Sequence, residues 1–140
     1  MEICYVGLGK MGMNMVERML EKGHDVIAYD KDGEALQEAK QAGAHTAESL
    51  EKLVTACEPP RTIWIMVPHQ FVGDVIDTLL PLVDDGDTII DGGNSHFKKS
   101  VKRAERLQGD GIQFLDVGVS GGPSGARNGA CMMIGGPQEE

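Results

Sequence analysis

The sequence predicts an α/β fold: an open, doubly wound, mainly parallel sheet with helices on both faces. Short apolar segments alternate with amphipathic helical segments along the 140 residues. The apolar segments offer no polar side to solvent, which is typical of parallel strands buried on both faces. A chain of this length forms one domain, and right-handed crossovers between parallel strands place helices on each side of the sheet.

Seven segments are predicted strands because apolar residues follow one another between glycine, proline or polar residues. Trp64, the single tryptophan, lies in the most apolar of these segments, which we place at the centre of the sheet. The predicted strands are residues 3–6, 25–29, a short stretch near 45, 63–67, 88–90, 112–117 and 131–134.

Five predicted helices separate the first six strands. In the first, Met15 and Leu20 belong to an apolar face with three- and four-residue spacing, and Gly23 ends the helix. The same spacing is clearest in the fourth helix and marks a basic-faced fifth one. The remaining helices are predicted over residues 32–41, 49–56, 72–83 and 97–107.

The composition excludes several classes of partner and site. The net charge of −9 argues against nucleic acid or an anionic membrane as the main partner. Cys4, Cys57 and Cys131 are odd in number and lack a CxxC pair, so we expect three reduced cysteines and no metal site. No apolar run reaches the about 18 residues of a membrane span and no signal peptide is visible, so we expect a cytoplasmic protein.

The first strand runs into a glycine-rich turn of the GxGxxG type, which opens the first helix. Gly7 permits the tight turn, Gly9 lets the backbone approach a pyrophosphate, and Gly12 allows close packing of helix and strand. The phosphates would lie at the positive helix N-terminus. The turn predicts a Rossmann-type dinucleotide-binding domain over residues 1–140. Its candidate cofactor-binding residues are Gly7, Leu8, Gly9, Lys10, Met11 and Gly12.

An acidic residue at the end of the second strand indicates which dinucleotide binds. Asp30 lies 18 residues after Gly12, near the spacing of about 20 expected for a carboxylate that binds ribose hydroxyls. Asp30 and Asp32 would repel a 2′-phosphate by about 1–4 kcal/mol at ~4 Å, and only Lys31 compensates, so we predict NAD rather than NADP. Two alternatives stay open: Asp30 as a helix N-cap, and FAD or S-adenosylmethionine as the cofactor.

The loops after the fourth and fifth strands supply further candidates. Val67, Pro68 and His69 follow the fourth strand, where a loop normally passes along the cofactor, although His69 fits a solvated helix start better than a catalytic base. Asn94 follows the fifth strand in the sequence DGGNS and offers both a donor and an acceptor to the crevice. Ser95 is a candidate N-cap for the next helix.

The loop after the sixth strand, together with Gly135 and Gly136, accounts for seven glycines between residues 118 and 136. Successive N–H groups at Ser120, Gly121 and Gly122 can form an anion nest for a substrate carboxylate. A flexible loop is the plainer alternative. Arg127 could reach an anion, although a surface salt bridge is its simpler role.

Three segments together resemble the cofactor-binding domain of the decarboxylating 6-phosphogluconate dehydrogenases. They are GLGKMG at 7–12, DGGNS at 91–95 and VSGGPSGARNGACMMIGG at 119–136, and the resemblance covers the whole chain. DGGNS is the specific part, because 3-hydroxyisobutyrate dehydrogenases share the other loops and differ there. Asp30-Lys31-Asp32 stands where the NADP-using branch has Asn-Arg-Thr, so the chain is more similar to the NAD-using bacterial branch.

The resemblance implies a reaction and a division of labour. 6-Phosphogluconate would pass hydride to NAD and lose carbon dioxide to give ribulose 5-phosphate. Asn94 would contact both nicotinamide and substrate, while Ser120, Gly121 and Gly122 would hold the substrate. The general-base lysine would lie beyond residue 140, in or near a helical domain that forms a homodimer, so no catalytic residue is expected in this chain.

The C-terminal sequence, a proline followed by acids, is typical of a helix opening, and we therefore expect a larger protein. Two other functions stay open. One is a different β-hydroxyacid dehydrogenase, similar to 3-hydroxyisobutyrate dehydrogenase, and the other is a non-catalytic dinucleotide-binding regulatory module.

Overall fold

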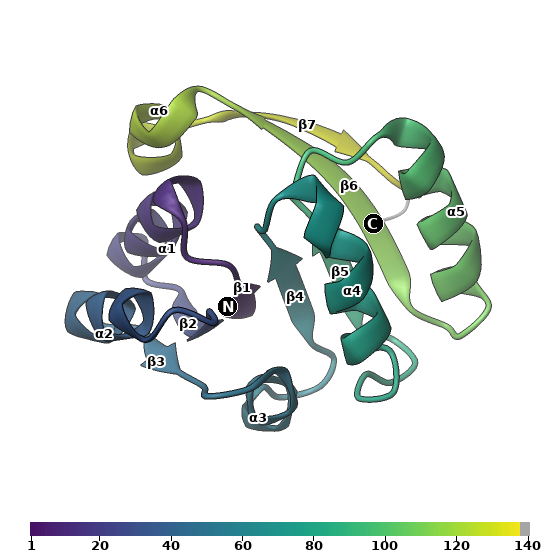
Figure 1. The fold of residues 1–140 in the computed structure, drawn as a ribbon, viewed down its shortest axis with the longest axis horizontal. Helices are drawn as coiled ribbons and strands as arrows, with labels where there is room; N and C mark the ends of the chain where they lie inside the picture. The colour runs from purple at the N-terminus through teal and green to yellow at the C-terminus, as the bar shows by residue number, and fades with distance from the viewer. Residues whose placement is uncertain (138–140) are drawn as a thin grey trace.

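A sheet of seven strands forms the centre of the computed structural model, which describes residues 1–137 (Figure 1). The strand order is β3-β2-β1-β4-β5-β6-β7, and all neighbouring strands are parallel except β6 and β7. The predicted doubly wound, mainly parallel sheet is confirmed. The strands are β1 (Glu2–Val6), β2 (Asp25–Tyr29), β3 (His45–Thr46), β4 (Thr62–Ile65), β5 (Thr88–Asp91), β6 (Gln113–Ser120) and β7 (Cys131–Gly135).

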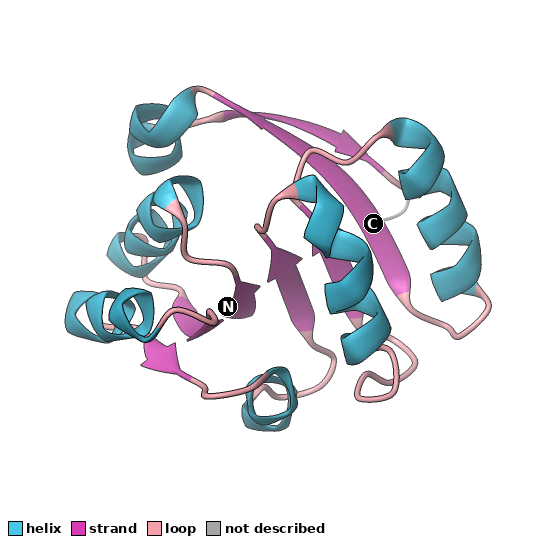
Figure 2. Ribbon diagram, viewed as in Figure 1, coloured by secondary structure: helices cyan, strands magenta, loops and turns pink. Residues whose placement is uncertain are grey.

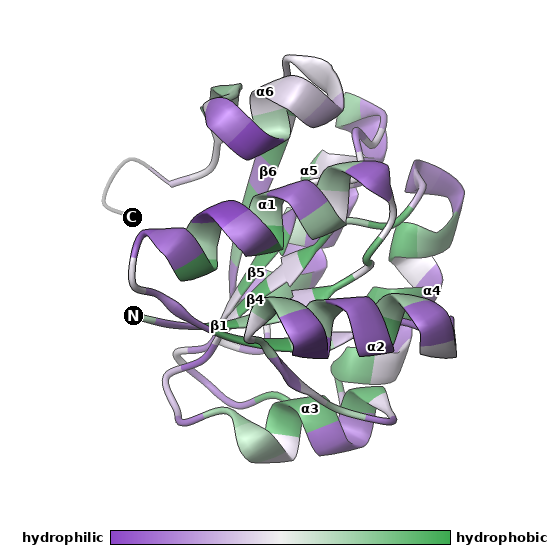
Figure 3. Cartoon of the chain, turned by 90° about the vertical axis from the view of Figure 1, so that its left-hand side faces the viewer, coloured by the Kyte–Doolittle hydropathy of each residue, from purple (hydrophilic) through white to green (hydrophobic). Residues whose placement is uncertain are grey.

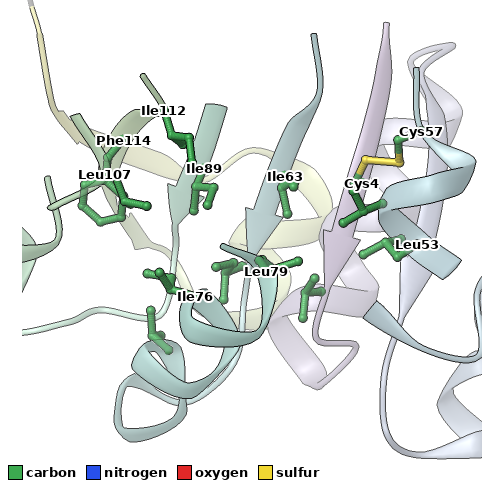
Figure 4. Close-up of a cluster of buried hydrophobic side chains, with 14 of the residues drawn as sticks. Cys4, Leu53, Cys57, Ile63, Ile76, Leu79, Ile89, Leu107, Ile112 and Phe114 are labelled. Carbon is green, nitrogen blue, oxygen red and sulfur yellow. A yellow bond between two sulfur atoms is a disulfide. The ribbon is translucent and has the colours of Figure 1, made fainter. Parts of the chain in front are cut away.

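Helices cover both faces of the sheet, as predicted (Figure 2). They are α1 (Lys10–Glu21), α2 (Gly33–Ala42), α3 (Leu50–Ala56), α4 (His69–Leu79), α5 (Phe97–Gln108) and α6 (Gly122–Asn128). One buried apolar cluster lies under α3, α4 and α5 (Figure 4), and a second lies under α1, α2 and α6. Figure 3 shows the hydrophilic outward sides of α1 and α2. Within residues 1–137, no helix combines the length and apolar character that crossing a membrane requires.

The structure departs from the predicted elements around the later loops. β6 continues to Ser120, past the predicted end at 117, and a helix, α6, occupies the segment predicted as a loop or nest. Ala126 is the only buried residue of α6, so the sequence has no apolar periodicity that would predict this helix. α4 begins at His69, directly after Pro68 and three residues before the predicted start.

The prediction of three reduced cysteines is wrong for two of them. Cys4 in β1 and Cys57 at the C-terminal end of α3 form a disulfide, with their Cα atoms 6.5 Å apart (Figure 4). The two residues are separated by 53 positions along the chain, and only the packing of α3 against the sheet brings them together. Cys131 on β7 is free and exposed.

The edge of the sheet beside α5 carries an apolar surface. Large apolar side chains are exposed on α5 and on β7, at Phe97, Val101, Met132, Met133 and Ile134. A cavity of about 640 Å³ opens between α5 and the end of β7. The expected helix opening among the C-terminal acids falls on residues 138–140, outside the described residues.

Candidate functional site

A pocket of about 350 Å³ lies where the loops after β1, β4 and β5 meet. The strand order changes direction here, because β2 and β3 lie on one side of β1 and β4 to β6 on the other. Ligands of doubly wound sheets bind at this switch point, outside the carboxyl ends of the strands. The lining residues are Gly9, Lys10, Met11, Gly12, Met66, Val67, Pro68, Gly92, Gly93, Asn94 and Val119.

The glycine-rich turn has the geometry that a pyrophosphate needs. Gly7 has a φ of +103°, and its N–H donates to the Tyr29 carbonyl at 2.9 Å. A methyl group at Gly12 would overlap the Gly7 carbonyl oxygen, whereas one at Gly9 would meet no atom within 4 Å. Gly9 is the N-cap of α1 and no side chain caps this helix, so its first N–H groups can bind an anion. The turn thus fits a dinucleotide phosphate.

Asp30 ties the end of β2 to this turn. Its Oδ2 accepts the Leu8 N–H at 2.6 Å, and its Oδ1 accepts the Asp32 N–H at 2.8 Å. Asp32, not Asp30, caps α2, since it accepts the Glu34 N–H at 2.9 Å. Each Asp30 oxygen keeps a lone pair for a ribose hydroxyl.

Five of the candidate cofactor residues do not line the pocket: Gly7, Leu8, Asp30, Lys31 and His69. The Leu8 side chain is buried in the second core cluster, and only its N–H reaches Asp30. His69 is exposed at the first position of α4, as expected of a solvated helix start. The ammonium group of Lys31 lies 5.5 Å from the centre of the Phe71 ring on α4, a cation–π contact that the sequence analysis missed.

A buried carboxylate organises the turn that carries Asn94. Asp91, at the end of β5, is fully buried and accepts the Gly93 N–H at 2.9 Å and the Ser95 hydroxyl at 2.6 Å. Arg103 of α5 donates to Asp91 Oδ2 at 3.1 Å and to Ser95 Oγ at 2.8 Å. Ser95 therefore does not cap α5, and the ring of His96 accepts the Lys98 N–H in its place. The pairing of Asp91 with Arg103 gives no sequence signal, because it spans a turn and a helix.

The candidate substrate residues Ser120, Gly121 and Gly122 lie where β6 meets α6, just past Val119 of the pocket. They do not line the pocket themselves. Gly121 has a φ of +132° and no side chain caps α6. Arg127 is held by Glu17 and Glu21 of α1, with Nε 3.0 Å from Glu17 Oε2, which confirms the salt-bridge interpretation. Met66, Gly92, Gly93 and Val119 are lining residues that the sequence analysis did not select.

Residues 2–140 match the family described as the NAD binding domain of 6-phosphogluconate dehydrogenase. The chain belongs to this family. It is 44% identical over 142 residues to the NAD(+)-dependent, decarboxylating 6-phosphogluconate dehydrogenase of Haloferax volcanii, covering 99% of the chain and 46% of the relative. The chain thus spans about half the length of that relative.

Solved structures agree with membership of the 6-phosphogluconate dehydrogenase family. The Plasmodium falciparum 6-phosphogluconate dehydrogenase, described with NADP+ and with its substrate, superposes with a TM-score of 0.89 at 29% identity, over 99% of this chain and 31% of that one. The 3-hydroxyisobutyrate dehydrogenase of Mycobacterium tuberculosis superposes with a TM-score of 0.90 at 24% identity, over 99% and 47%. The second likeness shows the fold alone. The chain is therefore a Rossmann-type, dinucleotide-binding domain of an oxidoreductase family.

Proposed function

We propose that this chain is the NAD-binding domain of an enzyme that oxidatively decarboxylates 6-phosphogluconate. Hydride would leave C3 of the substrate for the nicotinamide, and the resulting β-keto acid would lose carbon dioxide and give ribulose 5-phosphate. The observation that carries the proposal is the pocket in which the glycine-rich turn and Asn94 face the same space. Membership of the 6-phosphogluconate dehydrogenase family supports the substrate.

Within that enzyme, this chain would bind the cofactor and orient it toward the substrate. The pyrophosphate would bind at the uncapped N-terminus of α1, and Asp30 would accept hydrogen bonds from the hydroxyls of the adenosine ribose. NAD, when bound, supplies the hydride acceptor. Asn94 would contact nicotinamide and substrate, and residues 120–122 would hold the substrate at the start of α6. A general-base lysine would come from a helical domain outside this chain, which would pack on the apolar surface of α5 and β7 and form the homodimer.

The activity is tested with a protein that joins this chain to such a helical domain. Supplied with 6-phosphogluconate and NAD, it is expected to form NADH and carbon dioxide in equal amounts. Turnover only on unphosphorylated 3-hydroxy acids would instead favour a 3-hydroxyisobutyrate dehydrogenase-like enzyme. Dinucleotide binding without turnover on either class of acid would leave the regulatory module as the remaining function.

The preference for NAD is proposed from the charge at the end of β2. A 2′-phosphate beside the Asp30 carboxylate would meet like charge, and Lys31 is drawn toward Phe71 rather than toward this carboxylate. We expect NADH to quench the fluorescence of Trp64 and to bind the chain about tenfold or more tightly than NADPH. Trp64 is a suitable reporter because its indole Nε1 would lie 2.7 Å from a Cβ at Gly92, under the pocket.

Replacing Asp30 by alanine should narrow the difference between NADH and NADPH to about threefold or less, because the repulsive charge is removed. Asp77→Ala is the matched control, since Asp77 is an exposed acid of α4 that pairs with Arg106 outside the pocket. Equal discrimination in the Asp30→Ala variant and the unaltered chain would remove Asp30 from this role. Fluorescence titration of each variant with both cofactors measures the difference.

A further inference from the structure

We propose, on the basis of the dinucleotide-binding function proposed above, that Arg103 is a positioning residue for the nicotinamide end of the site. Arg103 does not line the pocket. It acts through Asp91 and Ser95, which fix the turn that carries Asn94. Loss of Arg103 would therefore loosen the part of the site that binds the nicotinamide and leave the part that binds ADP-ribose in place.

Burial makes the contact between Arg103 and Asp91 a strong one. The Asp91 side chain has no exposed surface and that of Arg103 is 14% exposed, with 3.1 Å between the guanidinium and the carboxylate. Where water is excluded, it does not compete for the donor and the acceptor, so a charged hydrogen bond there is stronger than an ion pair on the surface. The same guanidinium nitrogen also donates to Ser95 Oγ at 2.8 Å. Arg103 thus holds both the start and the end of the turn.

The turn needs this support because of its backbone conformation. Asn94 has a φ of +59°, the left-handed region, and it is the one non-glycine residue with positive φ among the described residues. Asp91 binds the residues on both sides of it: Oδ1 accepts the Gly93 N–H and Oδ2 accepts the Ser95 hydroxyl. A non-glycine residue in this region persists where surrounding contacts determine its conformation.

The turn that carries Asn94 also lines the pocket, together with the glycine-rich turn. A Cβ at Gly93 would lie 2.6 Å from the Val67 carbonyl oxygen and 2.7 Å from a methyl carbon of Val72, so the turn packs closely against the β4–α4 connection and against α4. Gly92, Gly93 and Asn94 all line the pocket. The ADP-ribose half of a dinucleotide would depend on Asp30 and the N-terminus of α1, which Arg103 does not contact.

The experiment compares two ligands on the 140-residue chain by isothermal titration calorimetry. NADH carries the nicotinamide, and ADP-ribose carries everything up to it. Arg103→Met is expected to weaken NADH binding about tenfold and to change ADP-ribose binding less than about twofold. Arg103→Lys should recover part of the NADH affinity, because it restores a charged donor but not the planar guanidinium whose one nitrogen donates to both Asp91 and Ser95.

Arg106→Met is the matched control on the same helix, since its ion pair with Asp77 is exposed on both sides. It should leave both affinities unchanged. If Arg103→Met does not fold, Ser95→Ala replaces it in the experiment. Ser95→Ala keeps the ion pair between Arg103 and Asp91 and should weaken the binding of NADH, by less than about tenfold, without changing the binding of ADP-ribose.

An equal loss of affinity for both ligands, or no loss for either, would overturn the positioning role, because a purely structural residue does not change their ratio. Failure of the unaltered chain to bind ADP-ribose would instead contradict the dinucleotide site itself, and with it the role of Arg103. The two failures are therefore distinguished by the unaltered chain.

Discussion

Replacing Gly12 by alanine is expected to abolish measurable dinucleotide binding and to lower the free energy of unfolding by about 3 kcal/mol. The added methyl carbon would overlap the backbone oxygen of Gly7, which cannot move as a side chain can. Gly7 is itself confined, because a methyl group there would overlap the Met66 carbonyl oxygen. Relief of the overlap must therefore shift the whole turn and break the bond between the Leu8 N–H and Asp30.

Gly9→Ala is the matched control for Gly12→Ala. A methyl group at Gly9 meets no atom within 4 Å, so the fold should lose no more than about 1 kcal/mol. NADH binding should still weaken, because Gly9 lines the pocket. Urea unfolding measures stability and NADH titration measures binding. Equal stability of the two variants would show that the close approach of Gly12 to Gly7 does not constrain the turn.

Replacing Arg61 by methionine is expected to cost about 3–5 kcal/mol of unfolding free energy at pH 7. The guanidinium lies 2.9 Å from Asp87 Oδ2, and Asp87 is fully buried. Its Nε also donates to the carbonyl oxygens of Val54 and Cys57 at the end of α3, at 3.1 and 3.2 Å. The substitution would leave a buried carboxylate without its counter-charge, which is the costly way to break such a pair.

The loss should depend on pH. Burial alone would raise the pKa of Asp87, but the N–H groups of Asp84 and Arg61 and the Arg61 guanidinium outweigh it and hold this pKa below its ordinary value. A lowered carboxyl pKa stabilises the fold above the unfolded value of about 3.9, and the contribution is lost as pH falls through the folded value. The difference between the unaltered chain and Arg61→Met should therefore shrink below about pH 4.

Arg106→Met again serves as the control, because its pair with Asp77 is exposed and should be worth less than about 1 kcal/mol. Urea unfolding of both variants at pH 7 and pH 3 measures the two effects. A cost below about 1 kcal/mol for Arg61→Met at pH 7 would mean that the hydrogen bonds from the backbone alone satisfy Asp87.

Much of the fold follows from local patterns in the sequence. Uninterrupted apolar runs predicted the strands, and their alternation with helices predicted the doubly wound, mainly parallel sheet. Helix α6 was missed because glycine and proline obscure its single buried residue, Ala126. The disulfide between Cys4 and Cys57 was missed because it depends on how α3 packs, which spacing does not encode.

The candidate site was predictable where a loop has its own sequence signature. The glycine-rich turn and the Asn94 turn each have one, and the structure brings them into one pocket. Contacts between separate elements have no sequence signature. Examples are the contact of Arg103 in α5 with Asp91 and the contact of Lys31 with Phe71 in α4. For the same reason Ser95 was expected as a helix cap, whereas its hydroxyl is drawn to Asp91.

The two backbone contacts of Asp30 constrain how the cofactor preference of this chain could change. The Asp30 carboxylate, which we propose disfavours a 2′-phosphate, also accepts the Leu8 N–H of the glycine-rich turn. A substitution that removes the whole carboxylate, such as Asp30→Ala, would thus leave that amide without its acceptor and loosen the glycine-rich turn. An evolutionary route toward NADP accordingly passes through residues such as asparagine, which drop the charge at position 30 and keep an oxygen for the turn.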